Sequence, residues 1–323
     1  MAAFITSLES VAEIVIVIAL GYFLRKSGKF ADSFKGNISF LIMNVALPIS
    51  IFVSVLDNLT RGKLVGLAGG LLYTLISFAL GYIVAIALVY ILKIRKGRRG
   101  TFINMAVNAN TIFIGLPLNM ALFGTSGMTY FLIYYVMNTI STWAIGIFFI
   151  SGDDPTKEKG SSKGSFNWKK LLPAPLIGFL IALAWILIVN VKLPMWIDKT
   201  CNMIGGLVTP LSLIYIGIIL ADAGLSSIHF DKDSIAALIA RFVIAPAIMI
   251  GTLLVFMHTG AGIPNIEFGT LVIQSATPGL AVLPILVSQS HGDVDYATNL
   301  VVTSTILFVI VVPILMAIIN FIV

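Results

Sequence analysis

Two short polar segments interrupt an otherwise apolar chain, and their residue types suit anion binding. The first, NANTIFIGLP, covers residues 108–117, and the second, QSATPGLAVLP, covers residues 274–284. Each combines amide or hydroxyl side chains with glycine and proline, which disturb helical hydrogen bonding. Side-chain donors beside the N-terminus of a helix that restarts after a break suit a carboxylate. The candidate substrate-binding residues are Asn108, Asn110, Thr111, Gly115, Pro117, Gln274, Ser275, Thr277, Pro278 and Gly279.

Asn110 is the first candidate for direct contact with such an anion. Its amide also suits the N-cap of the helix that restarts after the break, and the two roles are compatible. For Gln274, Ser275 and Thr277 the alternative is that their side chains bond only to backbone groups that the second break leaves free. Both alternatives stay open at the level of sequence.

Charged residues inside apolar segments are further candidates, because an ionisable residue within a membrane usually has a function. Arg241 attracts the anion, pairs with a carboxylate such as Asp222, or extends to the membrane interface. Glu13 is a proton-binding group or an interfacial residue near the outer face. The 3 histidines show no zinc-ligand spacing, and no nucleophile–base pair is apparent, so we expect no metal, no cofactor and no enzymatic activity.

The composition indicates an integral membrane protein. Apolar residues make up 59% of the 323 residues and charged residues 11%, and the mean hydropathy is +1.05. Soluble domains are about a quarter charged. Apolar runs of about 20 residues recur along the chain, as in bilayer-spanning helices. The net charge of +6 arises from short loops, so we do not expect a nucleic-acid partner.

The apolar runs predict an all-α protein that crosses the bilayer ten times. Because helix ends are the least reliable part of such a prediction, the bounds are approximate. The predicted spans are Ser7–Leu24, Phe34–Leu56, Leu64–Leu92, Thr101–Phe123, Thr129–Ile150, Leu171–Val189, Ile197–Leu220, Ser234–Phe256, Phe268–Val287 and Thr298–Ile322.

A hydrophilic linker at residues 151–170 divides the chain into five spans within residues 1–150 and five within 171–323. Most basic residues follow the first, third, fifth and seventh spans, which would lie on one side of the membrane. Basic loops favour the cytoplasmic side. We therefore expect a multi-pass protein of the cell membrane with a cytoplasmic linker and both termini outside.

The two halves share short motifs in the same order, which predicts an internal repeat. ALPISIF and VTPLSLI align Pro48 with Pro210, and the two polar segments align Pro117 with Pro284. NTIST in the fifth span matches VVTST in the tenth. Because each half has five spans, the repeats enter the membrane in opposite directions, an arrangement typical of secondary transporters.

Four stretches resemble the auxin efflux carrier family of bacterial permeases and plant hormone exporters. GYFLRKSGKF ends the first span and NVALPISIF lies in the second. NTIFIGLP is similar to the family's Asn-Thr-x-x-x-Gly-x-Pro, and ARFVIAPAIM resembles its Arg-Phe-x-x-x-Pro-Ala segment. The resemblance covers essentially the whole chain except the linker.

The resemblance implies a scaffold domain of helices 1, 2, 6 and 7, which also forms a homodimer, and a moving transport domain of the other six. The broken helices 4 and 9 would cross there and hold a carboxylate, with Asn110 as its ligand. The start of helix 6 reads LLPAPL, without the amide ligands of the plant carriers, so small mono- or dicarboxylates such as malate or malonate are favoured over auxin. We expect elevator-type alternating access.

Two alternatives are a sodium-coupled organic-anion symporter of the related bile-acid type and a membrane sensor on the same fold. The symporters carry a glutamate about one turn before the helix 9 glutamine. Here the residue four before Gln274 is Thr270, which disfavours sodium coupling. A sensor would usually need a signalling domain, and no segment is long enough to form one.

Overall fold

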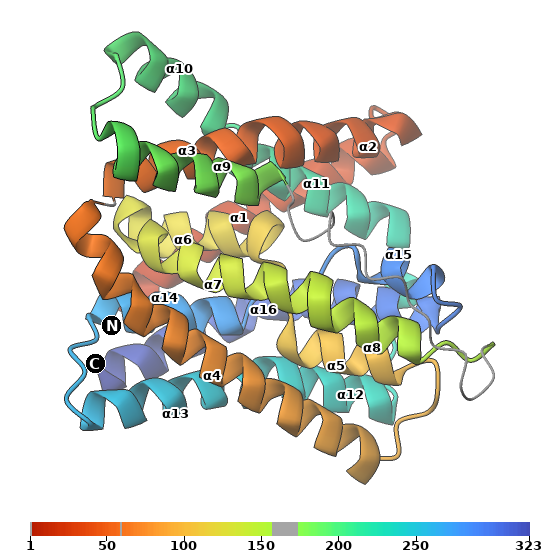
Figure 1. Cartoon of the computed structure of the whole chain (residues 1–323). Coiled ribbons are helices and arrows are strands. Elements are labelled where there is room, and N and C mark those ends of the chain that lie inside the picture. The colour runs from red at the N-terminus through yellow and green to blue at the C-terminus, as the bar shows by residue number, and fades with distance from the viewer. Residues whose placement is uncertain (1, 59, 157–173) are drawn as a thin grey trace.

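Apolar helices make up the computed structural model of the chain, which describes residues 2–58, 60–156 and 174–323 (Figure 1). Within these ranges no β-strand is present, in agreement with the predicted all-α class. Six helical stretches there are long and apolar enough to cross a membrane. They are Asp32–Asp57, Gly69–Ile91, Arg99–Gly152, Met195–Ala223, Lys232–His258 and Val294–Ile322.

The elements before the linker include three π-helical turns: η1 and η4 each continue one helix into the next, and η2 leads into α6. In chain order they are α1 (Ala2–Lys26), α2 (Asp32–Leu41), η1 (Ile42–Ala46), α3 (Leu47–Asn58), α4 (Arg61–Ile91), α5 (Arg99–Val107), η2 (Thr111–Gly115), α6 (Leu116–Phe123), η3 (Gly124–Gly127), α7 (Met128–Ile140), η4 (Ser141–Gly146) and α8 (Ile147–Gly152).

The second part of the chain repeats this mixture of α-helices and π-helical turns. Its elements are α9 (Ala174–Ala184), η6 (Trp185–Val189), α10 (Met195–Gly205), α11 (Val208–Ala223), η7 (Leu225–Ser227), α12 (Lys232–Ile239), η8 (Ala240–Ile244), α13 (Ala245–His258), α14 (Asn265–Ser275), α15 (Leu283–Ser288) and α16 (Val294–Ile322).

The structure changes two parts of the predicted layout. The span expected at residues 197–220 is not one continuous helix, because Gly206 and Leu207 separate α10 from α11. The predicted linker begins inside α8, and its residues 157–170 lie outside the described part of the chain, as do the first three residues of the sixth predicted span.

The helices form two groups with α6 and α7 between them (Figure 1). In one group α1 packs along α11, and α3 packs against α9 and α10. In the other, α4 contacts α5 and α13, α12 contacts α5, and α14 contacts α13 and α16. Helix α6 touches members of both groups, since it packs against α1, α11 and α14. This places the broken helices in the interior of the molecule.

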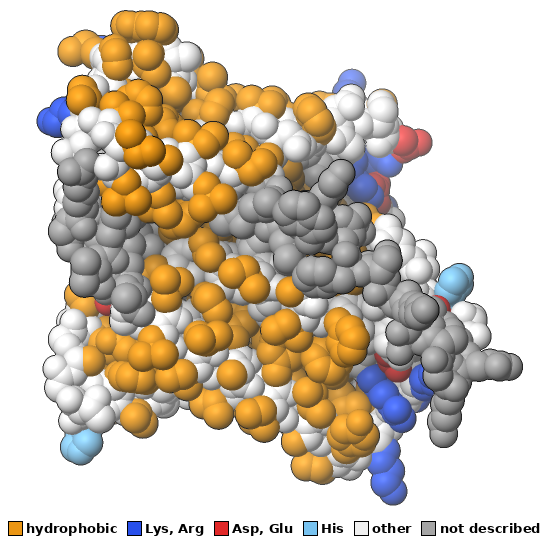
Figure 2. Space-filling model, in the orientation of Figure 1, with side chains coloured by type: hydrophobic (Ala, Val, Ile, Leu, Met, Phe, Trp, Pro, Cys, Tyr) orange, Lys and Arg blue, Asp and Glu red, His pale blue; other side chains and the backbone are white. Residues whose placement is uncertain are grey.

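The surface carries the polarity pattern of a membrane protein. Figure 2 shows hydrophobic side chains across most of the visible face, whereas lysine and arginine side chains gather mainly along its right-hand edge. That edge includes the start of α2 and the end of α8 in Figure 1. An apolar surface of this extent would be an aggregation hazard in water, but it suits the hydrocarbon of a bilayer.

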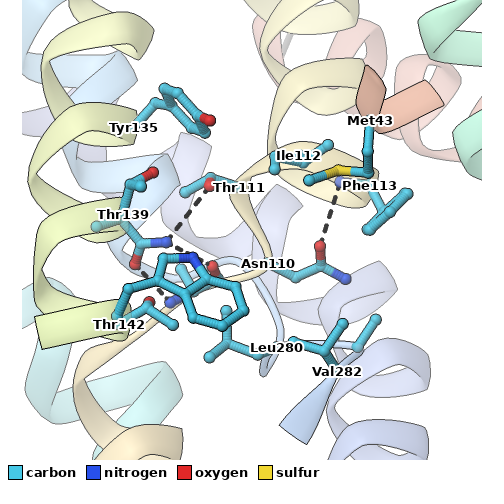
Figure 3. Close-up of a pocket in the computed structure, with 14 residues that line it drawn as sticks. Met43, Asn110, Thr111, Ile112, Phe113, Tyr135, Thr139, Thr142, Leu280 and Val282 are labelled. Carbon is cyan, nitrogen blue, oxygen red and sulfur yellow. Dashed lines mark hydrogen bonds between the residues drawn. The ribbon is translucent and has the colours of Figure 1, made fainter. Parts of the chain in front are cut away.

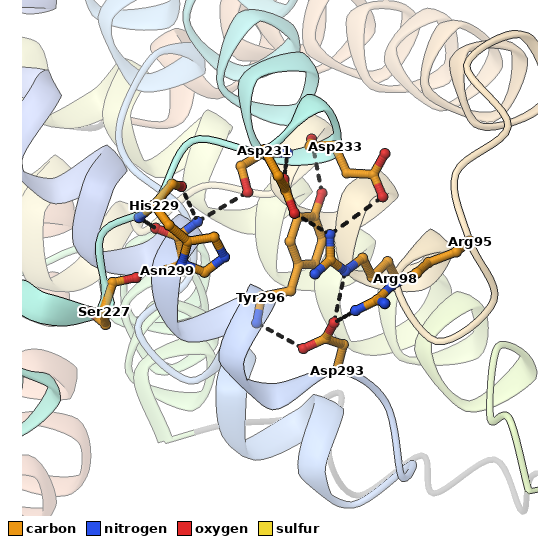
Figure 4. Close-up of polar contacts among 10 residues, drawn as sticks. Arg95, Arg98, Ser227, His229, Asp231, Asp233, Asp293, Tyr296 and Asn299 are labelled. Carbon is orange, nitrogen blue, oxygen red and sulfur yellow. Dashed lines mark hydrogen bonds and ion pairs between the residues drawn. The ribbon is translucent and has the colours of Figure 1, made fainter.

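A charged cluster ties three helix starts together at the same edge (Figure 4). The Arg98 guanidinium donates to Asp293 at 2.7 Å and to Asp231 at 2.5 Å, and it lies 4.4 Å from the centre of the Tyr296 ring. Asp231 also caps α12 by accepting from the Ser234 amide, and Asp293 caps α16 by accepting from that of Tyr296. One arginine thus connects α5, α12 and α16.

This cluster predicts a loss of stability in acid. Burial raises the pKa of Asp231, but hydrogen bonds from Arg98 and Ser234 outweigh burial and lower that pKa to about 2. The carboxylate in an unfolded chain has a pKa of about 4, so its stabilising contribution is complete above about pH 4 and is lost as the pH falls toward 2.

The measurement compares thermal unfolding of the wild type with Asp231→Asn, which keeps a capping side chain but removes the charge. The wild type should melt at the higher temperature near neutral pH, and the difference should shrink as the pH falls from about 4 toward 2. A difference that stays constant over that range would show that the charge of Asp231 is not what stabilises the fold.

Candidate functional site

Two interruptions of the helices meet in the interior of the protein. The first separates α5 from η2 at residues 108–110, and the second separates α14 from α15 at residues 276–282. The backbone amide of Asn110 donates a hydrogen bond to the carbonyl oxygen of Pro278 at 2.8 Å. Segments that are far apart in sequence are therefore in direct contact at their broken points.

The first interruption, at residues 108–110, lies before Gly115 and Pro117 in the sequence. Gly115 closes the π-helical turn η2, and Pro117 lies in the first turn of α6. Pro284 lies in the first turn of α15 in the same way. Pro284 pre-sets the helical backbone, costs no helical hydrogen bond and so favours the restart of α15 directly after the second break. Pro117 lies further along the restarting helix, just after the π-helical turn η2 that begins at Thr111.

A cavity of about 90 Å³ opens at this meeting point (Figure 3). That volume is several times what one water molecule needs. Most of the wall is apolar, while amide and hydroxyl groups come from the first break and from α7 and η4. The lining residues are Met43, Ala109, Asn110, Thr111, Ile112, Phe113, Tyr135, Asn138, Thr139, Thr142, Trp143, Leu280, Ala281 and Val282.

Asn110 both caps a helix and presents a donor to the cavity. Its Oδ1 accepts a hydrogen bond from the Phe113 amide at 3.2 Å, and the nitrogen of the same side chain points away from that bond (Figure 3). The side-chain Nδ2 is buried and has no hydrogen-bond partner among the described residues. A buried donor without a partner costs about 1–3 kcal/mol, which a bound acceptor would recover.

Two hydroxyl groups on the opposite wall share this property. Thr142 Oγ1 is buried without a hydrogen-bond partner in the described part of the chain. The Tyr135 hydroxyl also makes no hydrogen bond of good geometry, although it interacts with the side chain of Thr139. Together with Asn110 Nδ2 they give the cavity neutral donors from both sides. Neutral donors in an apolar pocket suit an anionic or strongly polar acceptor.

Asn138 holds the first break open from α7. Its Oδ1 accepts from the backbone amide of Ala109 at 2.8 Å, and its Nδ2 donates to the carbonyl oxygen of Ala109 at 2.9 Å. Its Nδ2 also lies 3.4 Å from Thr111 Oγ1. Asn138 therefore supplies the partner of the Ala109 N–H, and it shares the Ala109 carbonyl with the Thr111 amide.

Replacing Asn138 with alanine should destabilise the protein by about 1–3 kcal/mol, because it leaves the buried N–H of Ala109 unpaired, while the Ala109 carbonyl keeps its bond from the Thr111 amide at 2.9 Å. Thermal unfolding in detergent measures the effect. Asn320→Ala, which makes the same change on the exposed face of α16, is the control and should be close to neutral. Equal melting temperatures for both variants would contradict the role given to Asn138.

The other candidates of the first segment divide between the cavity and its surroundings. Thr111 lines the cavity. Asn108 does not, because its side chain belongs to a buried network with Asn104 at 2.8 Å and Ser141 at 2.5 Å. That network joins α5 to η4 and fixes the position from which the chain enters the break.

The polar side chains of the second segment bind backbone groups. Gln274 Nε2 donates to the carbonyl oxygen of Gly115 at 2.9 Å, which links α14 to η2. The hydroxyls of Ser275 and Thr277 donate to backbone carbonyls three residues earlier, at 2.6 and 2.9 Å. None of these three residues lines the cavity. Their side chains therefore hydrogen-bond to backbone groups near the break, which was the alternative to direct contact with the substrate.

Pro278 and Gly279 shape the second break. Pro278 accepts the bond from Asn110, and the Gly279 amide donates to Ser304 Oγ at 3.2 Å. A Cβ atom at Gly279 would lie 2.5 Å from Met105 Sδ, so a larger residue there would displace the Met105 side chain. Leu280 then enters the cavity wall directly after them.

The charged candidates lie away from the cavity. Asp222 pairs with Arg25 at 2.6 Å and with Lys35 at 3.2 Å, so the suggested pairing of Asp222 with Arg241 is wrong. Arg241 does not extend to the interface either, because its side chain is fully buried. Glu13 is exposed on α1.

The sequence did not identify several residues that line the cavity. Met43, Tyr135, Thr142 and Trp143 come from η1, α7 and η4, which are remote from both polar segments in sequence. The NTIST motif at residues 138–142 was recognised as part of the repeat, but not as part of a site. Hydroxyl and amide side chains one turn apart on an otherwise apolar helix were the available signal.

No group of three or more histidine, cysteine, aspartate or glutamate residues within the described ranges is arranged to hold a metal ion. The chemistry available at the cavity is therefore that of hydrogen-bond donors, a helix N-terminus and apolar contact surface. These groups can bind and orient a small ligand.

Comparisons with known proteins identify the family to which the chain belongs. A family model described as "Membrane transport protein" matches residues 6–316. An uncharacterized transporter from Methanothermobacter thermautotrophicus is 26% identical over 318 residues, covering 96% of this chain and 97% of that protein. An uncharacterized transporter from Methanocaldococcus jannaschii is 22% identical over 304 residues, covering 92% and 94% of the two chains.

Proposed function

Because the chain belongs to the membrane transport protein family, which is the auxin efflux carrier family, we propose that it is a secondary transporter of small organic anions. The substrate class is mono- and dicarboxylates such as malate or malonate, or auxin-like weak acids. The observation that carries the proposal is the unpartnered Asn110 Nδ2 in a buried cavity between the two helix breaks. A carrier of this kind is not an enzyme.

In the proposed binding mode, a carboxylate accepts a hydrogen bond from Asn110 Nδ2, and the hydroxyl of Thr142 is a second donor for polar groups of the substrate. The restarting helix formed by η2 and α6 begins at the cavity, and the partial positive charge at its N-terminus favours an anion. The apolar wall, including Leu280 and Trp143, would contact the rest of the substrate. A cavity of about 90 Å³ favours small acids over bulky ones.

The proposed architecture is ten membrane crossings in two inverted repeats, residues 1–150 and 171–323, joined by the linker 151–170. Two features support it. The long stretch Arg99–Gly152 bends at η3, which would divide it into two crossings. The two helices with central breaks occupy matched positions in the two halves, the pattern expected where inverted repeats form a transport site.

The proposed motion is an elevator-type movement of the cavity past a scaffold. Of the residues that line the cavity, only Met43 belongs to the group of α1, α2, α3, α9, α10 and α11, and the rest lie on α5 to α8 or beside α15. A site that takes almost nothing from that group can move relative to it, together with α6, α7 and the helices on their other side. We place the scaffold group at a homodimer interface and the protein in the cell membrane, with the linker cytoplasmic and both termini outside.

Sodium-coupled symport of the bile-acid type is the second candidate, and one observation weighs against it. Thr270, one turn before Gln274 on α14, is fully buried and supplies a neutral hydroxyl where those symporters carry an acid. A sensor that binds the anion without moving it is distinguished from a carrier by transport into vesicles that contain the protein.

The test is a thermal-shift screen of purified protein against malonate, malate, benzoate and indole acetate, with and without sodium and at two pH values. A bound ligand stabilises the folded protein by mass action, so a true substrate raises the melting temperature in proportion to the logarithm of its concentration. Methyl esters of the same acids are the control. A screen in which the esters stabilise as well as the acids would contradict carboxylate recognition.

A further inference from the structure

Arg241 is a fully buried cation at the crossing that is not among the residues lining the cavity. It lies in the π-helical turn η8, which directs it between α5 and α14. Such turns insert one extra residue into a helix and are frequent at functional sites. No aspartate or glutamate of the described chain forms an ion pair with it, which is unusual for a buried charge.

The partners of Arg241 are the ends of two helices. Its terminal nitrogens donate to the carbonyl oxygen of Ser275 at 2.7 Å, of Ala106 at 3.3 Å and of Met105 at 3.5 Å. Met105 and Ala106 belong to the last turn of α5, and Ser275 is the last residue of α14. These carbonyls lack helical partners because both helices stop at the breaks. The Tyr134 hydroxyl interacts with the same guanidinium.

The charges of this arrangement balance. The C-terminus of a helix carries the equivalent of about half a negative elementary charge, so two such ends amount to about one. The guanidinium, which stays protonated in proteins, supplies one positive charge at the point where both ends meet. On the other side of the first break, the N-terminus of the helix formed by η2 and α6 is left for an anion.

We propose that Arg241 is a positioning residue that supplies a fixed positive charge at the crossing, so that anion binding requires no coupling cation. This proposal rests on the proposed function for the identity of the bound anion, whereas the contacts of Arg241 are those of the structure. Backbone carbonyls at helix ends are the groups that coordinate sodium in broken-helix transporters. Here the guanidinium already occupies those carbonyls, and it holds α5 and α14 at the distance that lets Asn110 reach Pro278.

The experiment uses the full-length protein in nanodiscs and the variants Arg241→Gln, Arg241→Lys and Arg98→Gln. Arg98→Gln is the matched control, because it removes another largely buried arginine from the same group of helices without touching the crossing. Two readouts are taken: malonate affinity in sodium chloride and in choline chloride, and hydrogen exchange of the backbone amides in residues 105–111 and 275–280.

Malonate affinity of the wild type should be the same in both salts. Arg241→Gln should weaken it about tenfold or more, whereas Arg241→Lys, which keeps the charge, should stay close to the wild type. Amide exchange at the crossing should accelerate in Arg241→Gln and remain unchanged there in Arg98→Gln. A purely structural role would weaken binding equally in both Arg241 variants, and that result would overturn the proposal.

A requirement of the wild type for sodium would also overturn it. If malonate does not bind to the wild type, the choice of substrate class in the proposed function fails, and hydrogen exchange alone decides the role of Arg241. Unchanged exchange at the crossing in Arg241→Gln would then reject it. Should Arg241→Gln not fold, the Arg241→Lys variant and the comparison of salts on the wild type still carry the test.

Discussion

Asn110→Ala is expected to weaken carboxylate binding roughly 10- to 100-fold while leaving the protein folded. Hydrogen bonds to a charged partner contribute about 1.5–3 kcal/mol, which corresponds to that range of affinity. The substitution removes the one side-chain amide that donates into the cavity from the first break. It also removes the cap on Phe113, which adds about 1 kcal/mol of lost stability.

Isothermal titration with the best acid from the thermal-shift screen measures this effect, and Asn320→Ala is the matched control on an exposed face. Asn110→Asp separates the two roles of the side chain. An aspartate keeps the cap, because it can still accept from Phe113, but it places a negative charge in the cavity and should abolish binding. Full affinity in Asn110→Ala would mean that Asn110 only caps the helix.

Gly217→Ala is expected to cause the largest loss of stability. Gly217 on α11 faces Ile18 and Tyr22 on α1, where the two helices touch without intervening side chains. A Cβ atom there would overlap the carbonyl oxygen of Ile18 and lie 2.6 Å from the backbone nitrogen of Tyr22. Backbone atoms cannot rotate away, so α1 and α11 would have to separate, at a cost of about 3 kcal/mol or more.

Gly251→Ala is the control for this prediction. Gly251 lies within α13, and no atom lies within 4 Å of the position its Cβ would take. Alanine is the better helix former, so this change should be neutral or stabilise by up to about 1 kcal/mol. Thermal unfolding of both variants in the same detergent measures the contrast. Similar melting temperatures for the two would show that α1 and α11 are not in close contact.

Local sequence was sufficient to locate both breaks. Asn110 followed by Pro117, and Gln274 followed by Pro278, combine helix-breaking residues with polar side chains inside apolar runs. In lipid a broken backbone must find internal partners, so such a combination indicates both a break and groups that satisfy it. Asn110 was identified by this reasoning, and it is the residue that presents a free donor to the cavity.

The sequence did not predict which polar side chains line the cavity and which bind backbone groups. Gln274 and Asn110 have the same amide chemistry and each lies in one of the two polar segments, yet Gln274 binds the backbone of Gly115 while Asn110 Nδ2 has no partner in the part of the chain that the structure describes. Whether an amide nitrogen finds a backbone partner depends on how α14 packs against η2. Thr142 could not be predicted as a site residue either, because only the tertiary structure brings η4 against the first break.

Arg241 shows a second limit of sequence reasoning. A lone arginine in an apolar helix suggested an ion pair or an interfacial position, since buried charges are normally paired with opposite charges. The structure instead surrounds it with carbonyl oxygens at the ends of α5 and α14. Such carbonyl groups are available only where helices end in the interior. The sequence indicated that two helices end there, but it did not show that these ends lie beside Arg241.

Transport by proteoliposomes tests the central claim most directly. Vesicles that contain the purified protein are loaded with the unlabelled acid chosen by the thermal-shift screen, and exchange against the same acid in labelled form is followed. Uptake should clearly exceed that of protein-free vesicles, and vesicles with Asn110→Ala should approach the protein-free level at low substrate concentration. An acid that binds the wild type tightly but is not taken up by its vesicles would contradict a carrier and identify a sensor.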